Sequence, residues 1–179
     1  MPLDRRSVIL AVVAIPLARA AVAASPAASW RFASIDGGML DLADFRGGPV
    51  LVVNTASRCG STPPYDGLQA LWERYRDRGL TVVGVPSRSF GQELDSAGAV
   101  KDFCEVNFAI DFPMTGLVAV TGPDAHPFYA WAAGQGQAPT WNFHKLLLDG
   151  DGRIVAGFDR STEPDDPALI AAIEALLAG

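Results

Sequence analysis

Cysteine and histidine are both scarce in this chain of 179 residues, which holds two of each. Two cysteines, Cys59 and Cys104, cannot build a multi-disulfide scaffold, so they form one bond, one reactive thiol or two inert buried side chains. Neither His126 nor His144 has a Cys or His neighbour at the spacing of zinc ligands. The sequence therefore predicts no metal site and gives both histidines structural or surface roles.

Positive charge is also in short supply, with 14 Lys and Arg against 20 Asp and Glu and a formal net charge of −6. This acidic balance argues against a nucleic-acid-binding surface. Hydrophobic residues make up 49% of the chain, which is enough for one sizeable core. A length of 179 residues is too short for two domains of ordinary size. No internal repeat, linker or low-complexity stretch follows residue 29. We therefore expect a single domain over residues 24–179.

No apolar run is long enough to span a bilayer comfortably, which takes about 20 residues. The N-terminal run, residues 7–17, covers 11 and is interrupted by a proline. Arg5 and Arg6 before it, and a small-x-small site at 21–23, predict a cleaved export signal over residues 1–23, with an uncleaved anchor as the alternative. The arginine pair leaves the twin-arginine and general secretory routes both open. Cleavage removes three arginines and one aspartate, taking the net charge from −6 to −8, so we expect a periplasmic domain without stable membrane association.

The remaining chain alternates between strand and helix patterns. The predicted strands are 30–32, 39–42, 49–54, 80–85, 145–148 and 153–158, and the predicted helices are 65–78, 96–108, 126–133 and 164–177. Continuous apolar runs such as 49–54 are typical of strands buried on both faces of a sheet. The glycines of Asp36-Gly37-Gly38 favour a hairpin between the first two strands. This order predicts an α/β fold with a mixed central sheet, helices on both faces and an N-terminal β-hairpin.

Cys59 directly follows the strand 49–54 and precedes a helix. Reactive groups collect at the carboxyl ends of strands in open α/β sheets, and a helix N-terminus with a neighbouring cation, here Arg58, favours a thiolate. We therefore expect Cys59 to be a reactive thiol, with an inert buried cysteine as the alternative. The sequence that follows, Gly60-Ser61-Thr62, makes no C-x-x-C pair, which excludes disulfide exchange within one motif.

Two further polar segments accompany the Cys59 loop. Residues 85–93 follow the strand 80–85 at the same end of the sheet, and residues 141–145 precede a hairpin strand. The indole N–H of Trp141 and the amide of Asn142 would stabilise a neighbouring thiolate and orient a peroxide. A Trp-Asn pair alone is more often packing plus a turn. The prediction of a site therefore depends on the three segments taken together.

Five sequence elements, in order, resemble the glutathione peroxidase family over residues 29–178. They are VNTASRCGST-x-x-Y-x-x-L at 53–68, G-x-P-x-x-x-FG-x-E at 84–93, FC…FPM at 103–114, VTG…HPFY at 120–129 and WNFHK at 141–145. The resemblance implies a thioredoxin-like fold and thiol-dependent reduction of hydrogen peroxide or organic hydroperoxides in oxidative-stress defence. It implies no cofactor beyond an external reductant, either glutathione or a thioredoxin-like protein. It places Cys59 in the peroxidatic position, with Trp141 and Asn142 as its hydrogen-bonding partners. The short segment between Leu117 and His126 is similar to that of monomeric members.

Two residues depart from the family pattern. The glutamine that normally completes the catalytic set is Ser89, and Pro64 replaces the usual glutamine before Tyr65. A serine hydroxyl is shorter than a glutamine amide and needs a water to reach the same point. Arg88 is a candidate for compensating this loss by stabilising the thiolate. Because of Ser89, a non-catalytic binding protein on a peroxidase scaffold stays open as an alternative, as does a thiol–disulfide oxidoreductase.

Cys104 is the one internal candidate for a second reactive thiol. Attack of the Cys59 thiolate on a peroxide releases water or an alcohol and leaves a sulfenic acid, which a thiol must then resolve. Cys104 lies near the resolving-cysteine region of thioredoxin-dependent family members but is offset by one residue, which on a helix turns a side chain by about 100°. It shares a helical stripe with Phe103 and Phe108, so a buried core role is the alternative.

Overall fold

The computed structural model describes residues 29–59 and 63–178. The predicted export signal lies outside the described residues, as do Gly60, Ser61 and Thr62. The elements in chain order are β1 (Arg31–Ala33), β2 (Met39–Asp41), the 3-10 helix η1 (Leu42–Phe45), β3 (Val50–Thr55), α1 (Pro63–Tyr75), the 3-10 helix η2 (Arg76–Arg78), β4 (Thr81–Pro86), α2 (Ala97–Phe108), α3 (Pro127–Gly134), β5 (Lys145–Leu148), β6 (Ile154–Phe158) and α4 (Pro167–Leu177).

A mixed sheet of four strands in the order β4-β3-β5-β6 forms the centre of the fold. β3 runs parallel to β4 and antiparallel to β5, and β5 runs antiparallel to β6. β1 and β2 pair as a separate antiparallel hairpin. The predicted mixed sheet and N-terminal hairpin are confirmed. The register pairs Thr55 with Pro86 and Val53 with Lys145, so β3 and β4 end, and β5 begins, at the same edge of the sheet.

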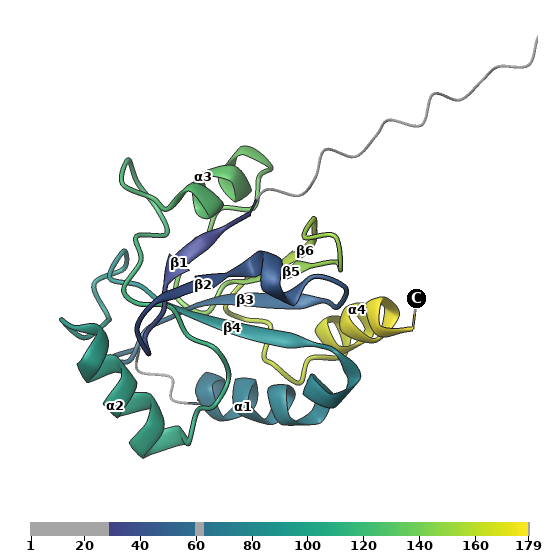
Figure 1. Ribbon diagram of the computed structural model, residues 1–179, viewed down its shortest axis with the longest axis horizontal. Helices are drawn as coiled ribbons and strands as arrows, with labels where there is room; N and C mark the ends of the chain where they lie inside the picture. Colours follow the sequence, from purple (N-terminus) through teal and green to yellow (C-terminus); the bar gives the residue numbers. More distant parts are fainter. Residues whose placement is uncertain (1–28, 60–62, 179) are drawn as a thin grey trace, which may run out of the picture.

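Both faces of the sheet are covered, which explains why β3 is apolar without alternation. Figure 1 shows α1 and α4 on one face, and the β1–β2 hairpin with α3 on the other. Successive residues of β3 face opposite sides. Leu51 and Val53 join the core under the helices, whereas Val50 and Val52 join the core under the hairpin.

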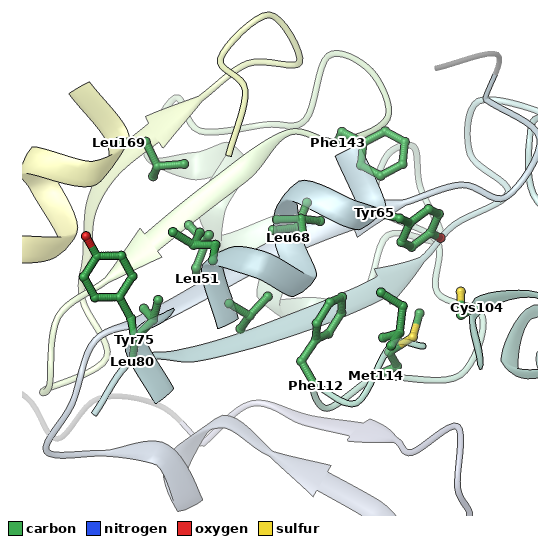
Figure 2. Packing of buried hydrophobic residues seen from close by; sticks show 14 of the residues in the cluster. Leu51, Tyr65, Leu68, Tyr75, Leu80, Cys104, Phe112, Met114, Phe143 and Leu169 are labelled. Carbon is green, nitrogen blue, oxygen red and sulfur yellow. The ribbon is translucent and has the colours of Figure 1, made fainter. Parts of the chain in front are cut away.

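The core under α1, α2 and α4 is called here the helix-side cluster. Its buried members are Leu51, Val53, Ala56, Cys59, Tyr65, Leu68, Leu71, Tyr75, Leu80, Val82, Val100, Cys104, Ile110, Phe112, Met114, Phe143, Leu147, Leu169 and Ile173. Figure 2 shows Leu68 of α1 and Leu169 of α4 above Leu51 of β3. Both cysteines of the chain belong to this cluster, Cys59 from the loop after β3 and Cys104 from α2.

The hairpin-side cluster fills the opposite face of the sheet. Its buried members are Phe32, Leu40, Leu42, Val50, Val52, Val83, Val85, Val120, Phe128, Tyr129, Ala132, Leu146 and Leu148. Phe128 of α3 makes an edge contact with Phe32 of β1, at a ring-centroid distance of 6.0 Å. Aromatic edge contacts of this kind hold α3 and the hairpin together above the sheet.

Most predicted elements begin or end one to three residues away from the observed bounds, and the helix predicted over 65–78 is α1 followed by η2. Two of these differences have a side-chain cap as their cause. The strand predicted over 39–42 ends at Asp41, because the Asp41 carboxylate accepts a hydrogen bond from the Ala43 N–H at 2.9 Å and starts η1. The helix predicted over 164–177 begins only at Pro167. Asp166 is its N-cap and accepts from the Ala168 N–H at 2.8 Å. Proline has no N–H to donate and fits the first helical position, so Glu163, Pro164 and Asp165 precede the helix.

Candidate active site

Three loops meet at the edge of the sheet where β3 and β4 end. They are residues 56–59 after β3, residues 87–94 after β4, and residues 141–143 before β5. The parallel pairing of β3 with β4 and the antiparallel pairing of β3 with β5 bring them together. The prediction that these polar segments share one end of the sheet is confirmed.

Asn54, near the end of β3, fixes the segment 141–143. Its side-chain Nδ2 donates to the carbonyl oxygen of Trp141 at 3.0 Å, and its own carbonyl oxygen accepts from the Phe143 N–H at 2.6 Å. Phe143 has a φ of +62°, which is the left-handed region that non-glycine residues seldom occupy. The buried Lys145 supports this turn, since its Nζ donates to the Phe143 carbonyl oxygen at 2.9 Å. Burial lowers the pKa of Lys145 to about 8.

The Cys59 loop is tied to the loop after β4 through its backbone. The Arg58 N–H donates to the carbonyl oxygen of Gln92 at 2.8 Å, and the Ser57 N–H donates to Glu93 Oε1 at 3.0 Å. Cys59 itself is 8% exposed and packs in the helix-side cluster. Arg58 is exposed. Two hydrogen bonds from the backbone N–H groups of Ser57 and Arg58 therefore hold the loop that carries the thiol. Their acceptors belong to the consecutive residues Glu93 and Gln92.

Glu93 is a buried carboxylate, 3% exposed. Its Oε1 accepts a second hydrogen bond from the Leu94 N–H at 2.7 Å, whereas its Oε2 has no partner among the described residues. Burial raises the pKa of Glu93, and hydrogen bonds from Ser57 and Leu94 together with the charge of Arg58 oppose that rise. A carboxylate held in this way acts as a rigid acceptor for the backbone of the Cys59 loop.

Trp141 and Asn142 both rest on the loop after β4. The Asn142 Nδ2 donates to Gln92 Oε1 at 2.7 Å, and Asn142 is fully buried. The Trp141 ring packs on Phe90 with centroids 5.2 Å apart, and 36% of Trp141 stays exposed. Gln92 therefore contacts two parts of the site at once, with its side chain on Asn142 and its carbonyl on Arg58.

Ser89 and Arg88 are engaged away from the Cys59 loop. The Ser89 hydroxyl oxygen accepts from the Val120 N–H at 3.0 Å. The exposed Arg88 forms an ion pair with Asp95 at 3.3 Å, and exposed pairs of this kind contribute about 0–1 kcal/mol. Both residues line a cavity of about 290 Å³ whose other walls are Leu117, Val118 and Ala119.

Cys104 is enclosed in the helix-side cluster, with 1% of its surface exposed. The hydroxyl end of Tyr65 points toward it (Figure 2). Burial, opposed by the contact with Tyr65 and assisted by the charges of Glu93 and Glu105, raises the pKa of the Cys104 thiol to about 11. In this arrangement Cys104 is a weak nucleophile, because the thiolate is the reactive form.

The two histidines serve the fold in different ways. His126 is the N-cap of α3, where its Nδ1 accepts from the Phe128 N–H at 3.2 Å. Its Nε2 therefore carries the proton and donates to the Arg31 carbonyl oxygen at 3.0 Å. Burial lowers the pKa of His126. His144 is buried and has no hydrogen-bond partner for either ring nitrogen among the described residues, and burial lowers its pKa as well.

Four residues that hold the site together were not singled out from the sequence. Glu93 stands in the FG-x-E element, so its motif was visible without its role, whereas Gln92 occupies a variable position of that element. Asn54 and Lys145 read as parts of strands. Within residues 29–59 and 63–178 there is no group of three His, Cys, Asp or Glu able to hold a metal, and no helix with the length and apolarity to cross a membrane.

A protein-family model described as "Glutathione peroxidase" matches residues 28–133. The chain belongs to the glutathione peroxidase family. Members of this family are oxidoreductases that reduce peroxides with a thiol as electron donor, so peroxide and a thiol reductant are the two reaction partners and no prosthetic group is involved.

Curated relatives cover most of the chain. The "Hydroperoxy fatty acid reductase gpx1" of Synechocystis sp. is 44% identical over 156 residues, covering 80% of this chain and 91% of the relative. The "Thioredoxin/glutathione peroxidase BtuE" of Escherichia coli is 33% identical over 170 residues, covering 80% of this chain and 93% of the relative. The aligned stretches of 156 and 170 residues each fit the length of one glutathione peroxidase domain.

Solved structures give the same fold. The crystal structure of T. cruzi GPX1 superposes with a TM-score of 0.66 at 28% identity, covering 84% of this chain and 95% of that one. A thiol:disulfide interchange protein of the thioredoxin family from Chlorobium tepidum superposes with a TM-score of 0.61 at 19% identity, covering 86% of this chain and 96% of that one. At that identity the second likeness shows the thioredoxin-like fold alone, which confirms the predicted fold class.

Proposed function

We propose that Cys59 is the peroxidatic residue of this glutathione peroxidase and that Trp141 and Asn142 are its polar partners. The observation that carries this assignment is the joint attachment of both segments to one loop, since Gln92 accepts from Arg58 beside the thiol and from Asn142. The alternative of a thiol–disulfide oxidoreductase has less support, because Cys59 begins no C-x-x-C motif.

The reaction begins when the Cys59 thiolate attacks the distal oxygen of the hydroperoxide. The O–O bond breaks, the proximal oxygen leaves as an alkoxide or hydroxide and takes up a proton, and Cys59 becomes a sulfenic acid. An external thiol then attacks the sulfur, releasing water and forming a mixed disulfide. A second thiol displaces Cys59 and completes the cycle, so one hydroperoxide and two thiols give one alcohol or water, one water and one disulfide.

Direct reduction of Cys59 by the external thiol is supported by the state of Cys104. The Cys104 side chain is 1% exposed and its thiol pKa is raised to about 11, so the thiol is enclosed and protonated at neutral pH, which disfavours its attack on the Cys59 sulfenic acid. We therefore assign Cys104 to the core. After treatment with one equivalent of peroxide, mass spectrometry should find a trapped sulfenic acid at Cys59 and a free thiol at Cys104. A Cys59–Cys104 disulfide would instead make Cys104 the resolving residue.

The activity is tested by peroxide consumption of the purified protein, with glutathione and thioredoxin compared as donors. The Cys59→Ser variant should consume no peroxide. The Cys104→Ser variant is the matched control, and it should still consume one equivalent in the first turnover because that step involves Cys59 alone. A wild-type protein that consumes no peroxide with either donor is the result expected of a non-catalytic binding protein.

Organic hydroperoxides with an acyl chain are the proposed substrate class. Support comes from two Synechocystis relatives named hydroperoxy fatty acid reductases, at 44% and 46% identity. The cavity of about 290 Å³ beside Ser89 has apolar walls at Leu117, Val118 and Ala119, which suit a hydrocarbon chain. The test compares the second-order rate constant for linoleic acid hydroperoxide with that for hydrogen peroxide, and equal rate constants would argue against an acyl-chain site.

The protein is proposed to work as an exported, monomeric domain of residues 24–179 that defends the periplasm against oxidative stress. Support comes from the signal-like pattern of residues 1–23 and the net charge of −8 that remains after its removal. Cell fractionation and N-terminal sequencing should find a periplasmic protein beginning at Ala24. Replacing Arg5 and Arg6 by lysine distinguishes the routes, because only twin-arginine export would stop. Light scattering of the mature protein tests the monomer.

A further inference from the structure

We infer that Gln92 is a positioning residue that orients the Asn142 amide and so replaces the glutamine that is absent at Ser89. This inference rests on the proposed function, because it concerns the reaction of Cys59 with peroxide. It concerns one hydrogen bond, from Asn142 Nδ2 to Gln92 Oε1, at 2.7 Å.

That hydrogen bond holds the nitrogen end of the Asn142 amide against the loop after β4. A side-chain amide has an oxygen at one end and two N–H donors at the other, and the two ends have nearly the same shape. In the structure, Gln92 Oε1 accepts from the nitrogen end and takes one of its two protons. The second N–H then remains for a thiolate or a bound peroxide. The Asn142 Oδ1 is buried without a partner among the described residues, so within that part of the chain Gln92 is the one side-chain hydrogen-bond partner that holds the Asn142 amide.

Ser89 does not perform this task in the present arrangement. Its hydroxyl oxygen accepts from the Val120 N–H at 3.0 Å, on the side of the cavity lined by Leu117 and Val118. Gln92, three residues later, reaches Asn142 with its side chain while its carbonyl holds Arg58. Its own amide nitrogen donates to no residue in the part of the chain that the structure describes. In the loop after β4, Gln92 is therefore the residue whose side-chain amide contacts Asn142.

The side chain and the backbone of Gln92 have separate partners, which makes the inference testable. A substitution at position 92 removes the acceptor for Asn142 but keeps the carbonyl that accepts from Arg58. The Cys59 loop should therefore stay attached, and the half-buried side chain of Gln92 is not part of either core cluster. Thermal midpoints close to that of the wild type are expected for both Gln92→Met and Gln92→Ala.

The experiment measures the second-order rate constant of the reduced full-length mature protein with hydrogen peroxide in a double-mutant cycle. Misplacing one reacting group costs roughly ten- to a hundredfold in rate, so Gln92→Met and Gln92→Ala should each lower the rate constant about tenfold or more. In an Asn142→Ala background the same substitutions should change it less than about twofold, because Gln92 acts through Asn142. Gln135→Met, at the exposed end of α3, is the matched control and should behave as wild type.

Three results would overturn the inference. Wild-type rates in both Gln92 variants would show that the Asn142 amide needs no fixing. Equal factors in the wild-type and Asn142→Ala backgrounds would show that Gln92 acts independently of Asn142. A wild-type protein that fails to react with peroxide would remove the proposed function itself, and this is seen before any variant is compared. If one variant loses its cooperative thermal transition, the other provides the cycle.

Discussion

Replacing Glu93 by alanine should remove two hydrogen bonds, one that ties the Cys59 loop to the loop after β4 and one within the loop after β4 itself. The carboxylate accepts from the backbone N–H groups of Ser57 and Leu94, at 3.0 and 2.7 Å. A buried donor left without a partner costs about 1–3 kcal/mol, so loss of the buried Ser57 bond should lower the free energy of unfolding by about that amount, and loss of the part-buried Leu94 bond should add about 1 kcal/mol or less. This is a large part of the about 5–15 kcal/mol that stabilises an ordinary domain.

The Glu93→Gln variant is the matched control, since it keeps an oxygen at the position of Oε1 and removes the charge. It exchanges the unpartnered Oε2 for an unpartnered amide N–H₂, while the cost of burying a carboxylate disappears. We therefore expect its free energy of unfolding to lie within about 1 kcal/mol of the wild type at neutral pH. Urea denaturation of the three proteins, with equal m-values as the check on a common unfolded state, gives the comparison.

The pH dependence of this pair has a defined sign. Burial raises the pKa of Glu93 above the 4.5 of an ordinary glutamate, so the native state holds this proton more tightly than the unfolded chain. The contribution of Glu93 to stability is therefore largest below pH 4.5 and is lost as the pH rises through its native pKa. The free energy of unfolding of Glu93→Gln should therefore rise relative to that of the wild type as the pH increases from 4.5 through the native pKa of Glu93. Equal stabilities of Glu93→Ala and Glu93→Gln at neutral pH would refute the role of the two hydrogen bonds.

Three further predictions concern the fold and the thiols. Gly48→Ala should lower the thermal midpoint by several degrees, because its Cβ would collide with a backbone carbonyl oxygen, whereas Gly98→Ala, which meets nothing within 4 Å, should be neutral or stabilising. The lowered pKa of His126 means that its contribution is complete above pH 6.5 and is lost as the pH falls below it. His126→Asn should therefore flatten the fall of the urea midpoint between about pH 7.5 and about pH 5. Iodoacetamide should label Cys59 before Cys104 in native protein, given the Cys104 pKa of about 11, and both at similar rates in denaturant.

The sequence was sufficient to predict where the three loops meet. Uninterrupted apolar runs indicated central strands, and chemistry collects where such strands end, so Cys59 and the segment that contains Trp141 were expected at one edge of the sheet. Two of the boundaries failed where a side-chain cap competed with a pattern. Asp41 and Asp166 cap the turns that follow them, and hydrophobic periodicity carries no information about such caps.

The supports of the site were beyond prediction because they are contacts between loops. Gln92 and Glu93 accept hydrogen bonds from the backbone of the Cys59 loop, and a backbone N–H leaves no signature in a sequence. Lys145 reads as a strand residue whose charge should reach solvent. It is buried instead because the left-handed turn at Phe143 presents a carbonyl oxygen to its Nζ.

Restoring the family residue at position 89 separates the roles of Ser89 and Gln92. A glutamine there has room in the adjacent cavity of about 290 Å³ but gives up the hydrogen bond from the Val120 N–H to the Ser89 hydroxyl, a loss of about 1 kcal/mol in the free energy of unfolding. Because Gln92 already fixes the Asn142 amide, Ser89→Gln should raise the rate constant with hydrogen peroxide by less than about twofold. The amide added at position 89 would have no further role in holding the Asn142 side chain, because Gln92 already holds it. A rise of about tenfold or more in stopped-flow measurements would show that the missing glutamine limits the reaction, and that Gln92 does not take its place.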